Sequence, residues 1–585
     1  MKFSILSLWI TCICVTIISF FYYPKWNKDT TEATISWDVS GYYWYLPAFF
    51  TYKDPRKLDF NQVIFDKYRP TPNLQQAFKA PNQNFVFKYS CGQAVMLLPP
   101  FCIANVSAKW LGYEADGFTR PYQFAIFLWG LLVSLTGLYI LRKILVQYFS
   151  ETAAGLSLLI IAFGTNFLEY GAITNAMTHN YLFTLYTFLI WLTILFYRKP
   201  SFSYAMGIGV CLGLMVLTRP TELVAVIFPL IFGIKITKTD ITERIKFLFS
   251  QFEKIFLTGV IIVCIGSLQL FYWKFSSGSW IVYSYEDQGF SWLRPHIMDG
   301  LFSGRAGWLI YSPVMVLVIP GFIYFYKNYR SLFYCLFIFS ALFMYITFAW
   351  DIWWYGGSIG QRAMVQIYPV LAFPLAAFIQ SFQAVNLKAM MTSLFVVCCI
   401  HYNIWVTHQA HYGGLLVAGE MTSEYLKAIF LKNQLPHDAR KLLDTKNMYK
   451  GEIKQPVYLM TENDSVGYIG NICLNDTVQF SPAKKFKLPS SNGWLRASAD
   501  FLTIHKEWES WKMTQLILKY YKAGKEINSD VLRAQRHLDP GKKVNLFLDS
   551  RLTDMPDEVE ILLWNSDGKT EICVDNIRLL FHSGE

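Results

Sequence analysis

Hydrophobic residues gather in long blocks along the first two thirds of the chain, with short polar stretches between them. A helix of about 20 apolar residues spans the roughly 30 Å hydrocarbon core of a bilayer. About eleven blocks reach or approach that length, and the fifth and sixth are short and closely joined. Their approximate ranges are 4–23, 122–141, 153–169, 178–197, 203–218, 222–234, 255–274, 307–326, 332–350, 364–382 and 389–408. The pattern predicts an α-helical polytopic membrane protein with about 11 transmembrane helices.

The pattern changes after about residue 410, where charged and polar residues become more frequent and apolar runs shorten. Leu, Ala and Lys dominate as far as about 455, which predicts a helical connector. Beyond it, apolar and polar residues alternate, as is typical of half-buried strands. The alternating positions are Val544, Leu546 and Leu548, then Val559, Ile561 and Leu563, then Ile572, Val574, Ile577 and Leu579. We therefore expect a transmembrane domain at 1–408, a connector at 409–455, and a small external β-sandwich-like domain at 456–585.

The composition agrees with a membrane protein, because 54% of the residues are hydrophobic, 18% are aromatic and only 16% are charged. A soluble protein carries roughly a quarter charged residues. The formal net charge is +11, and basic residues cluster in alternate connections between the spans. These residues are Arg142 and Lys143, Arg198 and Lys199, those between 235 and 254, Lys327 and Arg330, and Lys388. Since basic residues favour the cytoplasmic side, we expect a cytoplasmic N-terminus, an external C-terminal domain and no nucleic-acid partner.

Two details bear on the compartment. The first apolar block is not followed by a small-residue cleavage site, so we expect a retained span rather than a signal peptide. Most cysteines lie in apolar spans, but Cys473 and Cys573 lie in the external tail, where a disulfide can form.

Three external segments are too long to be simple turns, and they lie at about 24–121, 275–306 and 350–362. The first contains an apolar stretch at 94–104 that is interrupted by two prolines. If this stretch crossed the membrane, the basic residues of all later connections would change sides. We therefore expect it to lie along the outer membrane interface.

Asp38 is the first candidate for chemistry, because it lies among aromatic residues shortly after the first span. A carboxylate in such a place can act as a general base if it is within hydrogen-bond reach of the acceptor proton. An equally simple interpretation is an Asp that caps a helix beginning near Val39.

Basic residues on the same face are candidates for binding a donor phosphate, because arginine makes forked contacts with phosphate and lysine provides a point charge. These candidates are Lys88, Arg219, Arg294, Arg305 and Arg362. Lys88 can also be an anchor that reaches the membrane interface, and Arg219 can form an ion pair with Glu222.

Further polar and aromatic residues of the external face are candidates for binding substrate, because aromatic faces pack against sugar C–H surfaces. They are Tyr42, Tyr43, Tyr89, Asn175, His179, Glu222, Glu286, Asp351 and Trp354. His179 can equally make a structural hydrogen bond, and the tryptophans can belong to an interfacial belt. Asp38, Glu286, Asp287 and Asp351 can in principle offer oxygen ligands to a cation, but we expect neither a metal nor a cofactor.

Together these features resemble the GT-C class of integral membrane glycosyltransferases, the superfamily of protein O-mannosyltransferases and lipid A aminoarabinose transferases. The resemblance covers roughly residues 1–408. It depends on Asp38, the stretch from Lys88 to Ala104, the Arg219-Pro220-Thr221 turn, and the loops with Gly304-Arg305 and Trp354 to Arg362. The closest likeness is to uncharacterised bacterial members. Protein O-mannosyltransferases usually carry Asp-Glu where this chain has Asp38-Val39, and the last strands are similar to carbohydrate-binding β-sandwiches.

The resemblance implies a polyprenyl-phosphate-linked sugar as donor, inversion at the anomeric carbon, and Asp38 as the base that activates the acceptor hydroxyl. We therefore expect a glycosyltransferase of the bacterial inner (plasma) membrane that acts on a glycan, lipid or protein acceptor at the external face. Two alternatives stay open. One is a transporter or flippase of lipid-linked sugars, and the other is a non-enzymatic protein of envelope glycan assembly.

Overall fold

The structure, a computed structural model, describes residues 2–583 apart from 286–287, 383–385, 437–438, 446, 450, 461–471, 491, 507, 509–511 and 554. The chain divides into two compact units, Met1–Gly419 and Glu420–Glu585. The division falls inside the stretch predicted to be the connector. Each unit is described by itself.

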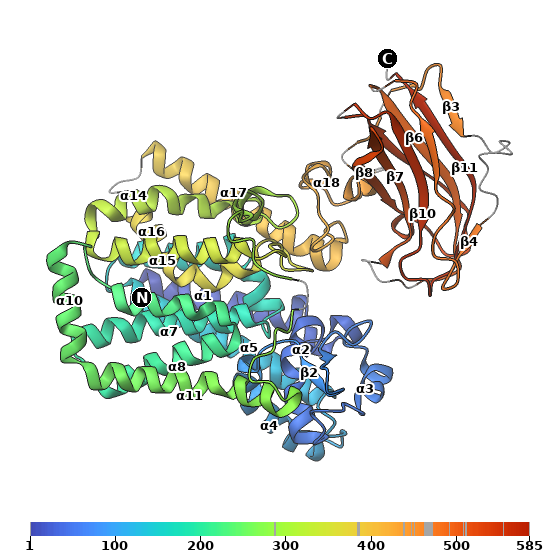
Figure 1. Ribbon diagram of the computed structural model, residues 1–585. Helices are drawn as coiled ribbons and strands as arrows, with labels where there is room; N and C mark the ends of the chain where they lie inside the picture. The colour runs from blue at the N-terminus through green and yellow to red at the C-terminus, as the bar shows by residue number, and fades with distance from the viewer. Residues whose placement is uncertain are drawn as a thin grey trace. The chain divides into compact units, whose positions relative to one another are not determined.

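Unit 1 is a helical bundle with a group of shorter elements, including α2, α3 and α4, at one end (Figure 1). Its helices are α1 (Phe3–Ile17), α2 (Trp37–Tyr43), α3 (Asn61–Tyr68), α4 (Gly92–Trp110), α5 (Arg120–Leu145), α6 (Glu151–Gly164), α7 (Thr178–Arg198), α8 (Phe202–Thr218), α9 (Ile227–Ile231), α10 (Lys238–Ser250), α11 (Phe252–Ser277), α12 (Ile297–Phe302), α13 (Trp308–Tyr311), α14 (Val318–Asn328), α15 (Arg330–Ala349), α16 (Tyr368–Gln380) and α17 (Leu387–His408). Short 3₁₀ segments precede three of them, namely η6 (Pro220–Val226), η7 (Pro313–Leu317) and η8 (Arg362–Ile367).

The predicted membrane-spanning architecture is confirmed. Within the described residues, seven helical segments are long and apolar enough to cross a membrane: Phe3–Asn27, Arg120–Leu145, Thr178–Arg198, Phe252–Ser277, Arg330–Ala349, Arg362–Gln380 and Leu387–Gly413. Shorter apolar helices occupy the other predicted blocks, at Glu151–Gly164, Phe202–Thr218, Pro220–Ile231 and Pro313–Asn328. The fifth and sixth blocks are α8 and the segment formed by η6 and α9, and only Arg219 separates them.

Glycines allow close approach where helices of the bundle cross, as is common in membranes. A Cβ atom at Gly321 of α14 would lie 2.1 Å from the Pro374 carbonyl oxygen of α16. A Cβ at Gly213 of α8 would lie 2.9 Å from the Ile265 side chain of α11. At Gly321 the obstacle is rigid backbone, so no side chain can be accommodated there without moving a helix.

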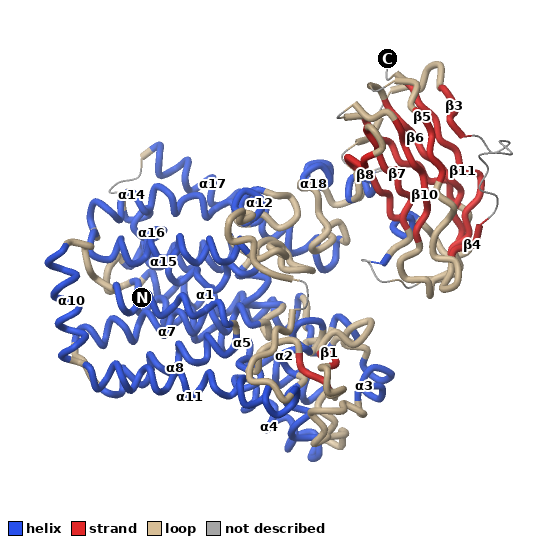
Figure 2. Tube along the Cα trace, in the orientation of Figure 1, coloured by secondary structure: helices blue, strands red, loops and turns tan. Residues whose placement is uncertain are grey.

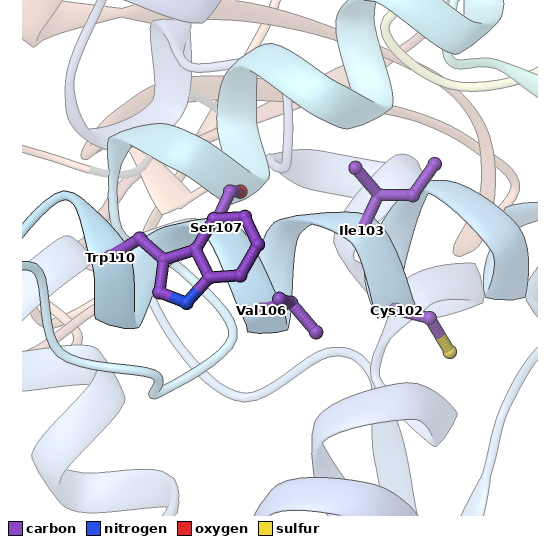
Figure 3. Close-up of a pocket in the computed structure, with 5 residues that line it drawn as sticks. All are labelled: Cys102, Ile103, Val106, Ser107 and Trp110. Atoms are coloured by element: carbon purple, nitrogen blue, oxygen red, sulfur yellow. The ribbon is translucent and has the colours of Figure 1, made fainter.

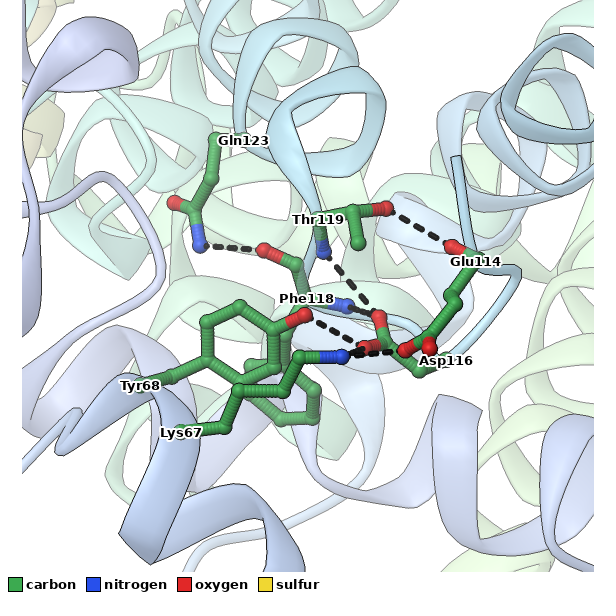
Figure 4. A network of polar contacts seen from close by, with 7 residues as sticks. All are labelled: Lys67, Tyr68, Glu114, Asp116, Phe118, Thr119 and Gln123. Carbon is green, nitrogen blue, oxygen red and sulfur yellow. Dashed lines mark hydrogen bonds and ion pairs between the residues drawn. The ribbon is translucent and has the colours of Figure 1, made fainter. Parts of the chain in front are cut away.

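The first long connection folds into a compact layer made of α2, α3, α4 and a hairpin of β1 (Ala77–Lys79) and β2 (Phe85–Phe87). Figure 4 shows the polar network that closes it. Asp116 accepts hydrogen bonds from the backbone N–H groups of Phe118 (2.8 Å) and Thr119 (3.1 Å) and from the Tyr68 hydroxyl. The Lys67 ammonium lies 3.4 Å from the same carboxylate. These contacts join α3 to the start of α5 and so fix the layer that carries Asp38.

The stretch expected along the membrane interface is part of α4, a continuous helix of 19 residues. One of its faces is exposed and apolar, and Trp110 at its end is 84% exposed. Cys102, Ile103, Val106, Ser107 and Trp110 line a shallow hollow of about 410 Å³ on this face (Figure 3). Such a face suits a position against lipid, and that position stays a prediction.

Unit 2 is a sandwich of two antiparallel sheets, and Figure 2 shows its strands. One sheet has the order β5-β10-β7-β8 and the other the order β3-β11-β6-β9, with β4 also paired to β11. The strands are β3 (Val457–Met460), β4 (Ile472–Leu474), β5 (Lys484–Lys487), β6 (Trp494–Leu502), β7 (Gln515–Lys522), β8 (Lys525–Arg533), β9 (Val544–Arg551), β10 (Glu558–Trp564) and β11 (Ile572–His582).

The strands predicted from the alternation of apolar and polar residues are present in unit 2 as β9, β10 and β11. All the alternating residues named above are buried in the sandwich core, apart from Val544, which is half-buried against it. Cys473 of β4 and Cys573 of β11 are directly opposite one another and form a disulfide. Among its described residues, the connector is helical in short pieces, including α18 (Ser423–Ile429) and the 3₁₀ segment Ala439–Leu443.

The close contact at Gly321 gives a test of the bundle. The Gly321→Ala variant should have a lower midpoint of thermal unfolding in detergent, because overpacking against backbone costs about 1–3 kcal/mol. The matched control is Gly259→Ala in α11, where nothing lies within 4 Å of the added Cβ. The control should unfold at the parent's midpoint or slightly above it. Equal midpoints for the two variants would contradict this account of the α14–α16 contact.

Candidate active site

Asp38 lies in the first turn of α2, where two side chains from distant parts of the chain hold its carboxylate. The Tyr89 hydroxyl donates to Oδ1 at 2.7 Å, and Nη2 of Arg362 donates to Oδ2 at 2.5 Å. The helix begins at Trp37, one residue earlier, so Asp38 lies inside its first turn instead of capping it. The side chain is 27% exposed, so the carboxylate can still be approached by another molecule.

The charge of Asp38 is strongly stabilised. Burial raises the pKa of this carboxyl, but Arg362, the Tyr89 hydroxyl and the nearby Lys88 together lower the pKa below the ordinary Asp value. Asp38 is therefore an anion at neutral pH. An anion is the state that a general base needs, although tight pairing with Arg362 weakens its basicity.

Two residues beside the charged groups have strained backbone. Trp37 has a φ of +46° and Tyr355 a φ of +56°, a region that is costly for residues with a side chain. Trp37 immediately precedes Asp38. Tyr355 lies in the loop that leads to Arg362. The strain is thus located on the two segments that carry the ion pair.

Arg219 follows the last residue of α8 and forms a second cationic group. Its guanidinium carbon lies 5.1 Å from the centre of the Tyr355 ring, and Nη1 lies 3.4 Å from Nδ1 of His179. His179 comes from the first turn of α7 and is buried. Arg219 and His179, which were predicted separately, therefore lie together.

Tyr42 connects Arg219 with the Asp38 ion pair. Burial raises the pKa of the Tyr42 phenol, Arg219 and Arg362 both act against that rise, and Asp38 adds to it. The contacts agree with this, because His179 links Arg219 to Gln366 of η8, and η8 begins with Arg362, which binds Asp38. Asp38, Arg219 and Arg362 thus form a single electrostatic cluster, which we call the acid–arginine cluster.

A buried polar network supports the arginines. Gln366 lies one turn after Arg362 in η8, with Oε1 3.1 Å from Nδ1 of His179, and its Nε2 donates to Glu222. Glu222 also accepts a hydrogen bond from the Tyr186 hydroxyl. The ion pair between Arg219 and Glu222 considered as an alternative is not formed, because Glu222 is engaged by these neutral donors.

Aromatic rings line the cluster on the side of the layer that contains α2, α3 and α4. The ring of Tyr89 lies 4.4 Å from that of Tyr42 and 6.3 Å from that of Tyr285, measured between centres. Lys88 extends its ammonium to 5.7 Å from the Tyr285 ring. A group of aromatic rings with a cation at its edge suits a sugar ring that carries a phosphate.

Two hydrogen bonds hold the loop that leads to Arg362. The backbone N–H of Ile359 donates to the Tyr170 hydroxyl at 3.2 Å, and the Gln361 side chain donates to the Trp353 carbonyl at 2.8 Å. Both contacts occur within the few residues before η8. They fix the backbone just before Arg362 and so restrict the position of its Cα atom.

Arg305 and Trp354 belong to this support. The Arg305 guanidinium lies 3.5 Å from the Trp354 ring centre, and its Nε donates to the Gly419 carbonyl at 2.6 Å. Gly419 also approaches the Gly356 carbonyl so closely that an added Cβ would lie 2.2 Å from that oxygen. Arg305 therefore stabilises the loop between α15 and η8 and is not brought to Asp38.

Within the described chain, three other predicted residues make no hydrogen bond or ion pair with the charged groups of the cluster and are engaged elsewhere or exposed. Asp351 accepts hydrogen bonds from the backbone of Gly289 and the side chain of Ser291, both at 2.8 Å, and so joins the loop after α15 to the loop before α12. Arg294 is exposed. Tyr43 follows Tyr42 but points to the opposite side of α2, where its hydroxyl donates to a backbone carbonyl.

Asn175 is buried, and neither polar atom of its side chain has a hydrogen-bond partner among the described residues. Gln93 at the start of α4 is similar, since its Nε2 donates to the Ala176 carbonyl at 3.1 Å while its Oε1 is unpaired within the described chain. Buried polar atoms of this kind are rare in proteins. Asn175 and Gln93 therefore provide unused hydrogen-bonding capacity next to the segment that leads into His179.

Glu286 and Asp287 lie outside the described residues, so their predicted roles have no structural counterpart. In the part of the chain that the structure describes, no group of three or more His, Cys, Asp or Glu side chains can hold a metal ion.

Three residues that contact the acid–arginine cluster or its supports were not predicted from the sequence, namely Tyr285, Tyr355 and Gln366. Tyr355 and Tyr285 are neighbours of residues that were selected. Gln366 follows Arg362 by only four residues, so it was also close in sequence to a selected residue. Tyr285 offered no such signal, because only the tertiary fold brings its loop to Tyr89.

Comparison with known proteins gives one family match. Residues 118–267 match the family described as dolichyl-phosphate-mannose-protein mannosyltransferase. This segment is less than half of the chain, and it includes His179 and Arg219 but neither Asp38 nor Arg362. No curated protein matches the chain.

Among solved structures, the chain is similar to the cryo-EM structure of arabinosyltransferase EmbB from Mycobacterium smegmatis. The sequence identity is 9% and the TM-score 0.29, and the similarity covers 77% of this chain and 57% of that chain. The chain therefore spans less than two thirds of that protein's length.

The family match confirms the predicted resemblance. Together with the helices that are long and apolar enough to cross a membrane, it supports a likeness to integral membrane glycosyltransferases of the GT-C class.

The hydrogen bond from Tyr89 gives a pH-dependent test. In a Tyr89→Phe variant, the pKa of Asp38 should rise, because burial would be less fully offset. Asp38 would then take up its proton at a higher pH, so the acid limb of the profile of kcat/KM for transfer should move upward. The control is Tyr43→Phe, which removes the same hydroxyl on the other side of α2 and should leave that limb in place. A Tyr89→Phe profile that coincides with the parent's would contradict the assignment.

Proposed function

We propose that the protein transfers a sugar from a polyprenyl-phosphate carrier to an acceptor hydroxyl at the external face of the membrane, with Asp38 as the general base. The observation that carries this proposal is the direct contact between Asp38 and Arg362 at 2.5 Å. Arg219 is linked to the segment of Arg362 through His179 and Gln366. A group that accepts a proton and two groups that can bind phosphate lie side by side. Transfer from a sugar phosphate needs both within a few ångströms of the anomeric carbon.

Arg219 and Arg362 would hold the phosphate of the donor. Their planar guanidinium groups can each donate two hydrogen bonds to phosphate oxygens. Lys88 lies near enough to Asp38 to lower its pKa and would add a point charge at the rim of the cluster. The aromatic rings of Tyr42, Tyr89 and Tyr285 would face the sugar.

The transfer step is an inverting substitution. The acceptor oxygen attacks the anomeric carbon while its proton passes to Asp38. The bond between that carbon and the phosphate oxygen breaks, and its electron pair stays with the phosphate. The products are the glycosylated acceptor, the carrier phosphate and a protonated Asp38, which releases its proton to solvent.

The ion pair between Asp38 and Arg362 would also determine the order in which the donor binds and the acceptor reacts. While Arg362 is bound to Asp38, the carboxylate is a weak base. A donor phosphate that draws the guanidinium toward itself would leave Asp38 with fewer hydrogen bonds, and its basicity would rise. Asp38 would become competent only when the donor is bound, so the carrier would bind before the acceptor reacts.

Replacing Asp38 tests the base. The Asp38→Asn variant keeps the shape and should lose at least about a hundredfold in kcat, the low end for losing a general base. Purified protein in proteoliposomes, supplied with a series of polyprenyl-phosphate sugars and candidate acceptors, gives the measurement as covalent product. The control is Asp66→Asn, an exposed position of α3 in the same external layer. Near-normal transfer by Asp38→Asn would refute the role, and donor movement between leaflets without product would favour a transporter.

The arginines give a second test with a matched control. Arg219→Gln should lower kcat/KM for the donor by about 10- to 100-fold, as expected for losing a charge-assisted contact of about 1.5–3 kcal/mol. Arg294→Gln removes the same charge from an exposed position of an external loop and should change donor use little. Equal effects of the two variants would mean that Arg219 acts only through the general charge of this face.

A further inference from the structure

The helix α10 lies at the end of the bundle opposite Asp38. The chain leaves Arg219 through the short span Pro220–Ile231, forms α10, and returns through α11 to the loop that contains Tyr285. Figure 1 shows α10 lying across the ends of α8 and α11. A helix that joins two spans in this way lies at the level of the membrane surface.

One face of α10 is fixed to the bundle. The Arg244 guanidinium stacks 3.9 Å from the centre of the Tyr197 ring at the end of α7 and donates to the Phe232 carbonyl. The Phe247 ring lies 5.2 Å from the same tyrosine. These contacts fix the rotation of α10 about its axis, so the residues on its other faces point away from the bundle.

A second face is apolar and uncovered. Ile241, Ile245 and Phe249 follow one another at intervals of four residues and are 40%, 49% and 74% exposed. The stripe continues past the corner at Gln251 into Phe252 of α11, which is 61% exposed. Since α11 crosses the membrane with much of its surface uncovered, the stripe on α10 is continuous with a surface that faces lipid.

Basic residues flank this stripe. Lys238 and Lys246 are exposed, and neither forms an ion pair with a described residue. The segment 235–254 holds five basic and three acidic residues. One of the acids, Asp240, is engaged by the helix-capping Thr237. An apolar stripe beside exposed lysines is the pattern of helices that bind acidic membrane surfaces.

We infer that α10 is an in-plane membrane anchor at the face opposite Asp38. Ile241, Ile245 and Phe249 enter the boundary between headgroups and acyl chains, and Lys238 and Lys246 bind acidic phospholipid headgroups. The continuity with α11 favours lipid over a protein partner, because such a partner would have to compete with the bilayer that surrounds the neighbouring span. The inference does not depend on the transfer reaction.

Photo-crosslinking of the full chain tests the apolar contact. Benzoylphenylalanine in place of Phe249, irradiated in proteoliposomes, should give lipid adducts that mass spectrometry detects. The control carries the same group in place of Glu243, which is exposed and lies on the other side of the helix, and it should give several-fold fewer adducts. Equal lipid adducts at the two positions, or adducts at 249 mainly to protein, would overturn the anchor.

A mixed bilayer tests the lysines. In proteoliposomes of phosphatidylcholine and phosphatidylglycerol, adducts at position 249 should be enriched in phosphatidylglycerol above its share of the bilayer. A Lys238→Gln/Lys246→Gln variant should lose this enrichment. The control Lys53→Gln/Lys57→Gln removes two charges from exposed positions in the connection that follows α2 and should keep the enrichment. Enrichment that survives in the first variant would exclude headgroup binding by these lysines.

Discussion

The ion pair between Asp38 and Arg362 joins two segments that are 324 residues apart, and the surrounding structure is arranged around it. A charge that is largely withdrawn from water is costly unless a partner and further hydrogen bonds compensate it. Tyr89 provides the further bond to Asp38. Tyr170 and Gln361 fix the loop before Arg362, and Asp116 closes the layer that carries α2. Removing either partner of the pair would leave the other uncompensated in this setting.

The second arginine is compensated differently. Arg219 stacks near Tyr355 and approaches His179, while the buried carboxylate of Glu222 acts on it only from a distance. Gln366 connects Glu222 to His179 and keeps both in place. Arg362 is thus directly neutralised, whereas Arg219 keeps more of its capacity to attract an anion. Both are mounted on the ends of membrane helices, which are rigid supports for groups that must be positioned accurately.

Much of the fold was predictable because it depends on local patterns. Apolar blocks of span length gave the helices, and period-two alternation gave the strands of unit 2. Asp38 could be selected because an acidic residue among aromatic ones after a span is unusual. The capping alternative for Asp38 could be decided only by the three-dimensional structure, since a sequence does not tell which side chain will reach an aspartate.

The arginines show the limit more sharply. The tight turns just before Arg219 and Arg362 favour these two residues over Arg305, which stacks on Trp354, but nothing in the local sequence tells that Arg362 is the one that meets Asp38. The difference arises from the path of the loop after α15, which Gly419 and Tyr170 help to define. Tyr42 and Tyr43 differ for a simpler reason. Adjacent residues of a helix point about 100° apart, so only one of them can face Asp38.

The two arginines have a consequence for the end of the reaction. In the proposed transfer, the donor is a phosphodiester with one negative charge, whereas the carrier phosphate left behind is a monoester with about 1.5 to 2 negative charges at neutral pH. The same guanidinium groups would therefore hold the spent carrier more tightly than the incoming donor. Asp38, protonated after transfer, would no longer compete for Arg362 until it lost that proton. Release of the carrier phosphate would then limit turnover, and kcat would depend on how quickly this lipid leaves the site for the surrounding bilayer.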